Sequence, residues 1–201
     1  WEKQCVDEQA AFSATGWWMS PMILDQNANT VQEAVDAYHA GDGEAIDQLF
    51  ITLFEANDHH LLRDMIASWH KNPFFHSREP LIQAAYRAHL QGEYLLSIPV
   101  LLLVVEGIAH DLVEKDPVAE QDANDHSAVK TIKWIYGQTK KKGIDHNKDN
   151  TSYFLEALDA YLYKSFHHRE GRLASPILNR HAILHGYTTS YGTVSNSLRC
   201  F

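Results

Sequence analysis

Residues 179–186, NRHAILHG, place Arg180 five positions before His185, with His181 and Asn179 beside the arginine. Histidine takes up and releases protons near neutral pH, because its ordinary pKa is about 6.5. Arginine is always charged, and its planar guanidinium matches two oxygens of one phosphate. This pair suits RNA cleavage without a metal. Histidine handles the protons of the 2′-hydroxyl and the leaving 5′-oxygen, and arginine stabilises the dianionic phosphorane. The expected products are a 2′,3′-cyclic phosphate and a 5′-hydroxyl.

Glu106 lies inside the most apolar segment of the chain. An isolated carboxylate is costly to bury there, so we expect it to have a cationic partner, and the candidate is Arg180. In that case Glu106 orients Arg180 or His181. The alternative is that Glu106 faces solvent or a polar interface.

The histidines also permit a metal site. His181 and His185 are four residues apart and share a helix face, as do Glu106 and His110, so two facing helices would place three histidines and a carboxylate around one ion. His110-Asp111 also resembles the His-Asp pair of HD-type phosphohydrolases, although the other ligands of that family have no counterpart at suitable spacing.

Positive charge gathers in a lysine-rich stretch over residues 130–148, and the candidates there for contact with an RNA backbone are Lys140, Lys141 and Lys142. Arg172 lies nearer the Arg180–His185 string and is a further candidate. The alternative for the lysines is a solvated loop.

Helices must position these residues, because strand patterns are nearly absent. Ser175-Pro176 predicts the start of the helix that carries Arg180 and His185, and Gly186 predicts its end. Around a straight helix, Arg180 and His185 would lie about 140° apart. Glu106 falls in a helix over 93–115 whose apolar residues predict a central, buried position.

Further helices complete a predicted all-α fold, over 30–40, 42–56, 57–72, 77–92, 127–136 and 151–166. A capping box at Thr30 begins the first, Asp42 caps the second, and Ser77 caps the fourth. Asn57 or Asp58 begins the third.

Composition describes a water-soluble globular chain. It has 201 residues, 45% of them hydrophobic, a mean hydropathy of −0.34, and 26 acidic against 17 basic residues for a net charge of −9. Broad nonspecific attraction to nucleic acid or anionic lipid is therefore not expected. The longest apolar run, 95–105, is shorter than the roughly 20 residues that span a bilayer, so it predicts a core helix and no membrane partner.

Two cysteines, Cys5 and Cys200, provide neither a disulfide framework nor a CxxC motif, which predicts a reducing, cytoplasmic location. Because the sequence opens on Trp1, we expect the natural start to lie upstream. The apolar residues up to Phe201 predict a C-terminal helix that continues beyond it.

The R-x4-H string, the polar His181, the trailing Gly186 and the order of helices resemble the HEPN superfamily, all-α proteins of which many are metal-independent endoribonucleases. The resemblance covers residues 77–201 as a HEPN-like helical bundle and leaves 1–76 as an N-terminal helical extension. Residues 94–107 and 191–197 are similar to parts of an uncharacterised bacterial family that carries the same motif.

The resemblance implies that Arg180 and His185 are the catalytic pair, with His181 assisting and Glu106 and Asn179 supporting them. It implies an RNA substrate, no metal or cofactor, and a homodimer whose two motifs line one cleft. It also implies a bacterial toxin, antiphage or stress role, restrained by an antitoxin or released by an activating partner. The alternatives are a non-catalytic HEPN-like module that binds RNA, a nucleotide or a protein, and a histidine-based metal-dependent hydrolase.

Overall fold

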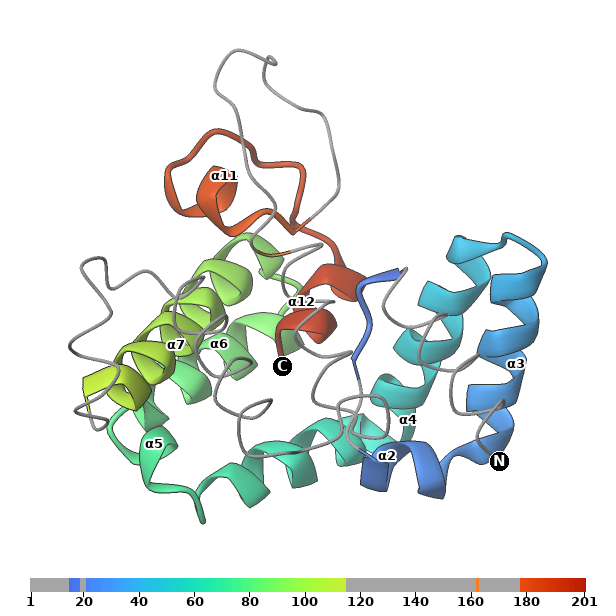
Figure 1. Ribbon diagram of the computed structural model, residues 1–201, viewed down its shortest axis with the longest axis horizontal. Coiled ribbons are helices and arrows are strands. Elements are labelled where there is room, and N and C mark those ends of the chain that lie inside the picture. The colour runs from blue at the N-terminus through green and yellow to red at the C-terminus, as the bar shows by residue number, and fades with distance from the viewer. Residues whose placement is uncertain (1–14, 19–20, 115–161, 163–177) are drawn as a thin grey trace, which may run out of the picture.

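The computed structural model describes residues 15–18, 21–114, 162 and 178–201. Within these ranges the regular structure is helical and no strand occurs, which confirms the predicted all-α class. The helices predicted over 127–136 and 151–166 lie outside the described residues. The described helices are α2 (Pro21–Gln26), α3 (Ala28–His39), α4 (Gly43–Trp69), α5 (Pro73–His76), α6 (Glu79–Leu90), α7 (Tyr94–Glu114), α11 (Arg180–Leu184) and α12 (Val194–Cys200) (Figure 1).

Helix α3 begins earlier than predicted. Asn27 occupies the N-cap position and Thr30 already lies in the first turn, so the predicted capping box is wrong. The reason is that α2 leads almost directly into α3, and the side-chain amide of Asn27 donates a hydrogen bond back to the carbonyl of Ile23 at 2.8 Å. The next cap is confirmed, because the Asp42 carboxylate accepts from the backbone N–H of Ala45 at 2.9 Å.

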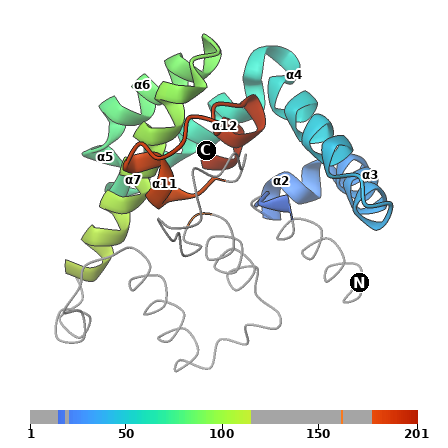
Figure 2. The ribbon, with the colours of Figure 1, turned by 90° about the horizontal axis from the view of Figure 1, so that it is seen from above.

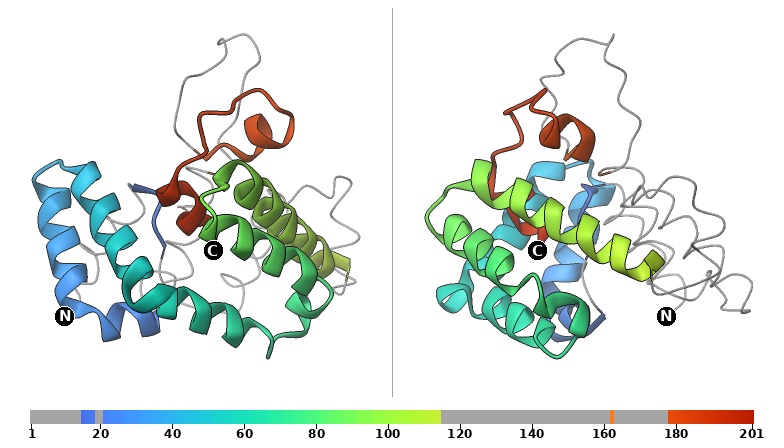
Figure 3. Two further views of the ribbon diagram at one scale, coloured as in Figure 1. Left: turned by 180° about the vertical axis from the view of Figure 1, so that it is seen from behind. Right: turned by 90° about the vertical axis from the view of Figure 1, so that its left-hand side faces the viewer.

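Helix α4 bends in the middle, and the two halves run in different directions (Figure 3). The bend lies where a break was predicted, at Asn57 and Asp58. These residues and His59 have left-handed backbone conformations, with φ of 52°, 58° and 55°. Asn and Asp enter this region more readily than most residues, so the sequence tolerates the turn here.

The predicted cap at Ser77 is wrong. A short helix, α5, intervenes after Asn72, whose side chain accepts from the N–H of Phe74 at 3.1 Å, and Ser77 ends that helix. Helix α6 then begins after Arg78, which occupies its N-cap position without a side-chain cap. The Arg78 guanidinium instead pairs with Asp111 on α7 at 2.7 Å.

Helix α7 is central, as predicted, and packs against α5, α6, α11 and α12 (Figure 2). Its inner face is buried at Ile98, Leu101 and Leu102, whereas Leu96 and Leu103 are exposed, so the expected full burial is confirmed for one face only. Tyr94–Asp111 is long and apolar enough to cross a membrane by length and composition, a test that a core helix of a soluble protein also passes.

Helix α12 lies between α7 and α4 and closes the main core (Figures 1 and 2). Leu198 of this helix joins one buried cluster with residues from both sides of the position-76 boundary, so the N-terminal helices and the following helices share their apolar interior. The cluster consists of Trp17, Ile23, Val31, Ala34, Ile46, Phe50, Phe54, Leu62, Ile66, Ile82, Val104 and Leu198.

Candidate functional site

Helix α11 carries Arg180 and His181 and ends directly before His185. It is only five residues long, because Asn179 adopts an extended backbone conformation with φ −95° and ψ 107°. The Asn179 side chain accepts from the N–H of Ala182 at 2.9 Å, so this residue caps the helix. The predicted helix start at Ser175-Pro176 lies outside the described residues, and a continuous helix through residue 179 is wrong. The predicted end is confirmed by Gly186, which has a φ of +69°.

Arg180 points at helix α7, where its Nε lies 2.5 Å from Oε1 of Glu106. This confirms the predicted pairing of the carboxylate inside the apolar helix with the arginine of the motif. The two side chains are 27% and 19% exposed, so the ion pair is only partly shielded from water. The contact fixes the arginine beside α7 by charge attraction.

His181, His185 and Tyr187 form a ring cluster along one side of α11 and the turn that follows it. The ring centroids of His181 and His185 are 4.4 Å apart, and each lies 6.0 Å from the ring of Tyr187. His185 and Tyr187 are exposed and His181 is half-buried. Spacing of four residues places the two imidazoles together, because positions i and i+4 share a helix face.

The chain after the ring cluster is anchored to the start of α7. Pro99 has no N–H, so a helix leaves the carbonyl of Leu95 without its usual partner. That carbonyl accepts a hydrogen bond from the Tyr191 hydroxyl at 3.3 Å. Gly192 packs against the Leu95 side chain, and a Cβ at Gly192 would lie only 2.7 Å from Leu95 Cδ2. A side chain at position 192 would therefore require the Leu95 side chain to move aside.

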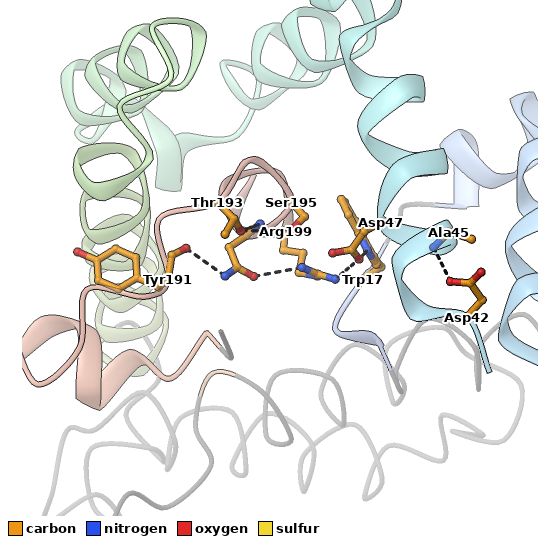
Figure 4. Close-up of polar contacts among 9 residues, drawn as sticks. Trp17, Asp42, Ala45, Asp47, Tyr191, Thr193, Ser195 and Arg199 are labelled. Carbon is orange, nitrogen blue, oxygen red and sulfur yellow. Dashed lines mark hydrogen bonds and ion pairs between the residues drawn. The ribbon is translucent and has the colours of Figure 1, made fainter. Parts of the chain in front are cut away.

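A polar chain then connects this segment with the N-terminal helices (Figure 4). The Asn196 amide donates to the Tyr191 carbonyl at 3.0 Å and its oxygen accepts from Arg199 Nη1 at 3.1 Å. Arg199 forms an ion pair with Asp47, which also accepts from the Trp17 indole N–H at 2.9 Å. The Arg199 guanidinium lies 4.7 Å from the centre of the Trp17 ring. The segment that follows the site is therefore held from α7 on one side and α4 on the other.

The predicted site residues separate into two groups within the described chain. Arg180 contacts Glu106, whereas His185, at the C-cap of the short helix, contacts the ring of His181 in its first turn. Asn179 supports the arrangement as a helix cap. The candidates for contact with an RNA backbone, Lys140, Lys141, Lys142 and Arg172, lie outside the described residues.

Metal binding was the alternative use of the histidines. Among the residues that the structure describes, no group of three or more His, Cys, Asp or Glu side chains is placed to hold a metal ion. The arrangement expected from His181, His185, Glu106 and His110 is thus not formed in this part of the chain, and the Glu106 carboxylate is engaged by Arg180.

A second polar cluster, which the sequence analysis did not identify, lies in the interior. His89 of α6, Ser97 of α7 and Ser197 of α12 form a buried His–Ser cluster, with His89 Nδ1 2.8 Å from Ser197 Oγ and Ser97 Oγ 2.9 Å from the same atom. The available signals were the position of His89 on the apolar face of its helix and a serine inside the apolar run. Neither signal identifies Ser197 as the partner.

Burial governs the charge of this cluster. Burial, with a smaller contribution from the nearby His59, lowers the pKa of His89 to about 4. The two rings meet edge to face with centroids 5.9 Å apart. Within the described residues, the buried Nδ1 of His59 has no hydrogen-bond partner. His89 is therefore neutral at physiological pH and acts as a hydrogen-bonding core residue.

Comparison of the chain with models of protein families, with curated proteins and with solved structures finds no match. The likeness to the HEPN superfamily thus rests on the R-x4-H string and the helix order, and it stays a prediction. The geometry around α11 is the remaining basis for an inference about function.

Proposed function

We propose that this chain is a metal-independent endoribonuclease of the HEPN type, acting in the bacterial cytoplasm in a toxin, antiphage or stress role. The observation that supports it best is the layout of α11. A carboxylate holds the arginine at the first residue of this helix. Two imidazoles in ring contact lie next to it, His181 at the second residue and His185 just beyond the helix end. The same short element thus carries a phosphate-binding group and proton-transfer groups.

Arg180 is the proposed clamp for the phosphate. Within the described residues, its ion pair with Glu106 uses Nε, so the two terminal nitrogens remain to bind two phosphate oxygens. Glu106 acts as a positioning residue, because it restricts the arginine side chain without occupying the edge of the guanidinium formed by the two terminal nitrogens. The fixed positive charge then stabilises the negative charge that develops on the phosphorane.

His185 and His181 are the proposed proton-transfer groups. In the reaction, the 2′-oxygen attacks phosphorus as its proton passes to one imidazole, and the bond from phosphorus to the 5′-oxygen breaks as that oxygen gains a proton from an imidazolium. The products are a 2′,3′-cyclic phosphate and a 5′-hydroxyl. The ring contact at 4.4 Å allows both imidazoles to reach one phosphodiester.

A homodimer completes the proposed site. Arg180 faces α7 while His185 lies exposed at the end of the helix, so one copy directs its clamp and its base to different places. A second copy facing the first would supply the missing member of each pair to a shared cleft. An inhibitory antitoxin or an activating partner would act by covering or forming this cleft.

The test is cleavage of single-stranded RNA in excess EDTA, with the product ends identified. We expect cleavage by the wild type, cyclic phosphate ends, and loss of cleavage in His185→Ala and in Arg180→Ala. His110→Ala is the matched control, since His110 belongs only to the metal alternative and should leave the rate unchanged. Cleavage that requires a transition metal, or that survives in His185→Ala, would contradict the proposal.

A non-catalytic RNA-binding module is the second candidate, and the Glu106–Arg180 contact supports it. A carboxylate 2.5 Å from the arginine offsets part of the positive charge that would stabilise a dianionic phosphorane, while leaving the arginine able to bind a phosphate. If wild-type protein binds RNA in an Arg180-dependent manner and produces no cyclic phosphate ends as a dimer, this second function replaces the first.

A further inference from the structure

Tyr187 occupies a fixed place beside the proposed catalytic residues. Gly186 turns the chain with a positive φ, and the backbone N–H of Tyr187 then donates to the carbonyl of Ala182 at 2.8 Å. This bond ties Tyr187 to the last turn of α11 in the manner of a helix C-terminal motif. Tyr187 is nevertheless 40% exposed, so a planar aromatic group is presented to solvent on a rigid backbone.

The ring of Tyr187 stacks on the imidazole of His181 and is tilted relative to that of His185. Its plane makes an angle of 28° with that of His181 and 32° with that of His185, and both centroid distances are 6.0 Å. A nucleobase stacked on this ring would carry its own ribose and phosphate within reach of the two histidines. The Tyr187 ring thus lies where a stacked base would bring its phosphodiester next to the proposed proton-transfer groups.

We propose that Tyr187 is the platform on which the RNA substrate stacks one unpaired base, at the nucleotide next to the cleaved phosphate. This inference rests on the proposed function for its substrate. A base inside a duplex keeps both faces covered by its neighbours, so the platform selects nucleotides in loops, bulges or single strands.

The charge of the chain supports stacking as a source of affinity. With a net charge of −9, the protein as a whole repels a polyanion, and phosphate contacts must be few and local. Stacking on an aromatic side chain adds affinity that does not depend on charge. Binding should therefore weaken less with salt than it does for basic RNA-binding proteins.

The experiment measures binding of the full chain to a fluorescein-labelled 2′-O-methyl oligouridine, which cannot be cleaved because it lacks the attacking hydroxyl. A second oligonucleotide carries dihydrouridine, whose non-planar ring stacks poorly, at one position at a time. We expect Tyr187→Leu to weaken binding on the order of tenfold and Tyr187→Phe to change it by less than about twofold. Trp18→Leu, which removes an exposed aromatic residue elsewhere in the fold, is the matched control and should bind like the wild type.

The dihydrouridine series locates the stacked base. At one position the replacement should weaken wild-type binding by about the same factor as Tyr187→Leu, and should add nothing in that variant. Equal binding by wild type and Tyr187→Leu would overturn the inference, as would equal weakening by the Leu and Phe variants, or no binding by the wild type. Thermal unfolding of each variant checks that it is folded.

Cleavage of unmodified oligouridine separates this inference from the proposed function. If Tyr187→Leu loses affinity and the wild type does not cleave, the platform stands and the nuclease assignment fails. If the wild type cleaves and Tyr187→Leu has the same kcat/KM and affinity, the nuclease stands and the platform fails.

Discussion

Two pairs of histidines in ring contact lie in opposite environments in this protein. His181 and the exposed His185 lie on one short helix and its C-cap, whereas the half-buried His59 and the fully buried His89 come from different helices. The first pair is adjacent to an ion-paired arginine. His89 of the other pair shares a hydrogen bond with the buried hydroxyl of Ser197.

The comparison shows that two histidines of one chain, His89 and His185, differ sharply in burial and in hydrogen bonding. Burial lowers the pKa of His89 to about 4, so it cannot carry a proton at neutral pH, and its nitrogen serves to join helices. His185 is exposed, so a bound molecule can reach its ring. A count of histidines in the sequence does not distinguish these two environments.

The largest expected effect is on cleavage. His185→Ala should lower kcat by roughly 100- to 10,000-fold, the usual contribution of a general acid or base. His89→Gln should retain kcat wherever the variant is folded, because His89 has no access to substrate. Steady-state cleavage of one RNA by both variants, each checked by circular dichroism, makes the comparison. A folded His89→Gln variant that has lost cleavage would remove the distinction between the pairs.

Acid should destabilise the fold through the buried His89. Between an unfolded pKa of 6.5 and a folded pKa of about 4, the unfolded chain binds a proton at His89 that the folded chain does not. The stabilisation is therefore complete above about pH 6.5 and declines as pH falls toward 4, by about 3 kcal/mol in total. Urea unfolding at several pH values measures it.

The matched variants for this acid effect are His89→Gln and His185→Gln. The first should lose this part of the pH dependence, and the second should keep all of it. Equal slopes of unfolding free energy against pH in wild type and His89→Gln would show that other groups cause the acid sensitivity.

Removing the buried hydroxyl of Ser197 should lower the free energy of unfolding by less than protonation of His89 does. Ser197→Ala deprives His89 and Ser97 of their shared partner, and leaving buried polar groups without a hydrogen bond lowers the free energy of unfolding by about 2 kcal/mol. His185→Ala, which removes an exposed ring, should change it by less than about 0.5 kcal/mol. Chemical denaturation of the two variants at pH 7.5 tests this part of the comparison.

The smallest expected effect concerns the partly shielded ion pair between Glu106 and Arg180. Glu106→Gln keeps the shape of the side chain and removes the charge that holds Arg180, so the free energy of unfolding should fall by about 1 kcal/mol and KM for RNA should rise roughly fivefold. Asp111→Asn removes the Arg78 ion pair from the same helix and should show a similar stability loss without the change in KM. Parallel changes in KM for both variants would mean that Glu106 only supports the fold.

Features that depend on one local residue or one large energetic cost could be predicted from the sequence. The cap at Asp42 and the break at Asn57 follow from side chains that favour those backbone conformations. The partner of Glu106 could be predicted because burying a lone carboxylate in an apolar helix is energetically costly, so a cationic residue must lie beside it. Arg180 was the candidate for that residue, and the structure places it there.

Features decided by competition between neighbouring residues could not be predicted. Thr30 and Ser77 are good caps, yet the adjoining α2 and α5 make other positions the helix starts. Asn179 replaces Ser175 as the cap at the start of the helix that carries the site.

The buried His–Ser cluster could not be predicted for a different reason. Ser197 is 108 residues from His89 along the chain, and only the packing of the helices brings them together.

The position of Leu198 in the main core has a consequence for synthesis. Its neighbours in that core, Phe50 and Ile82 among them, leave the ribosome long before α12 does, so the core stays open at one side until nearly the whole described chain has been made. Contacts over such sequence distances form slowly. During translation, the apolar residues of α4 and α7 that will meet α12 are exposed, and we expect the nascent chain to depend on chaperones until α12 is released.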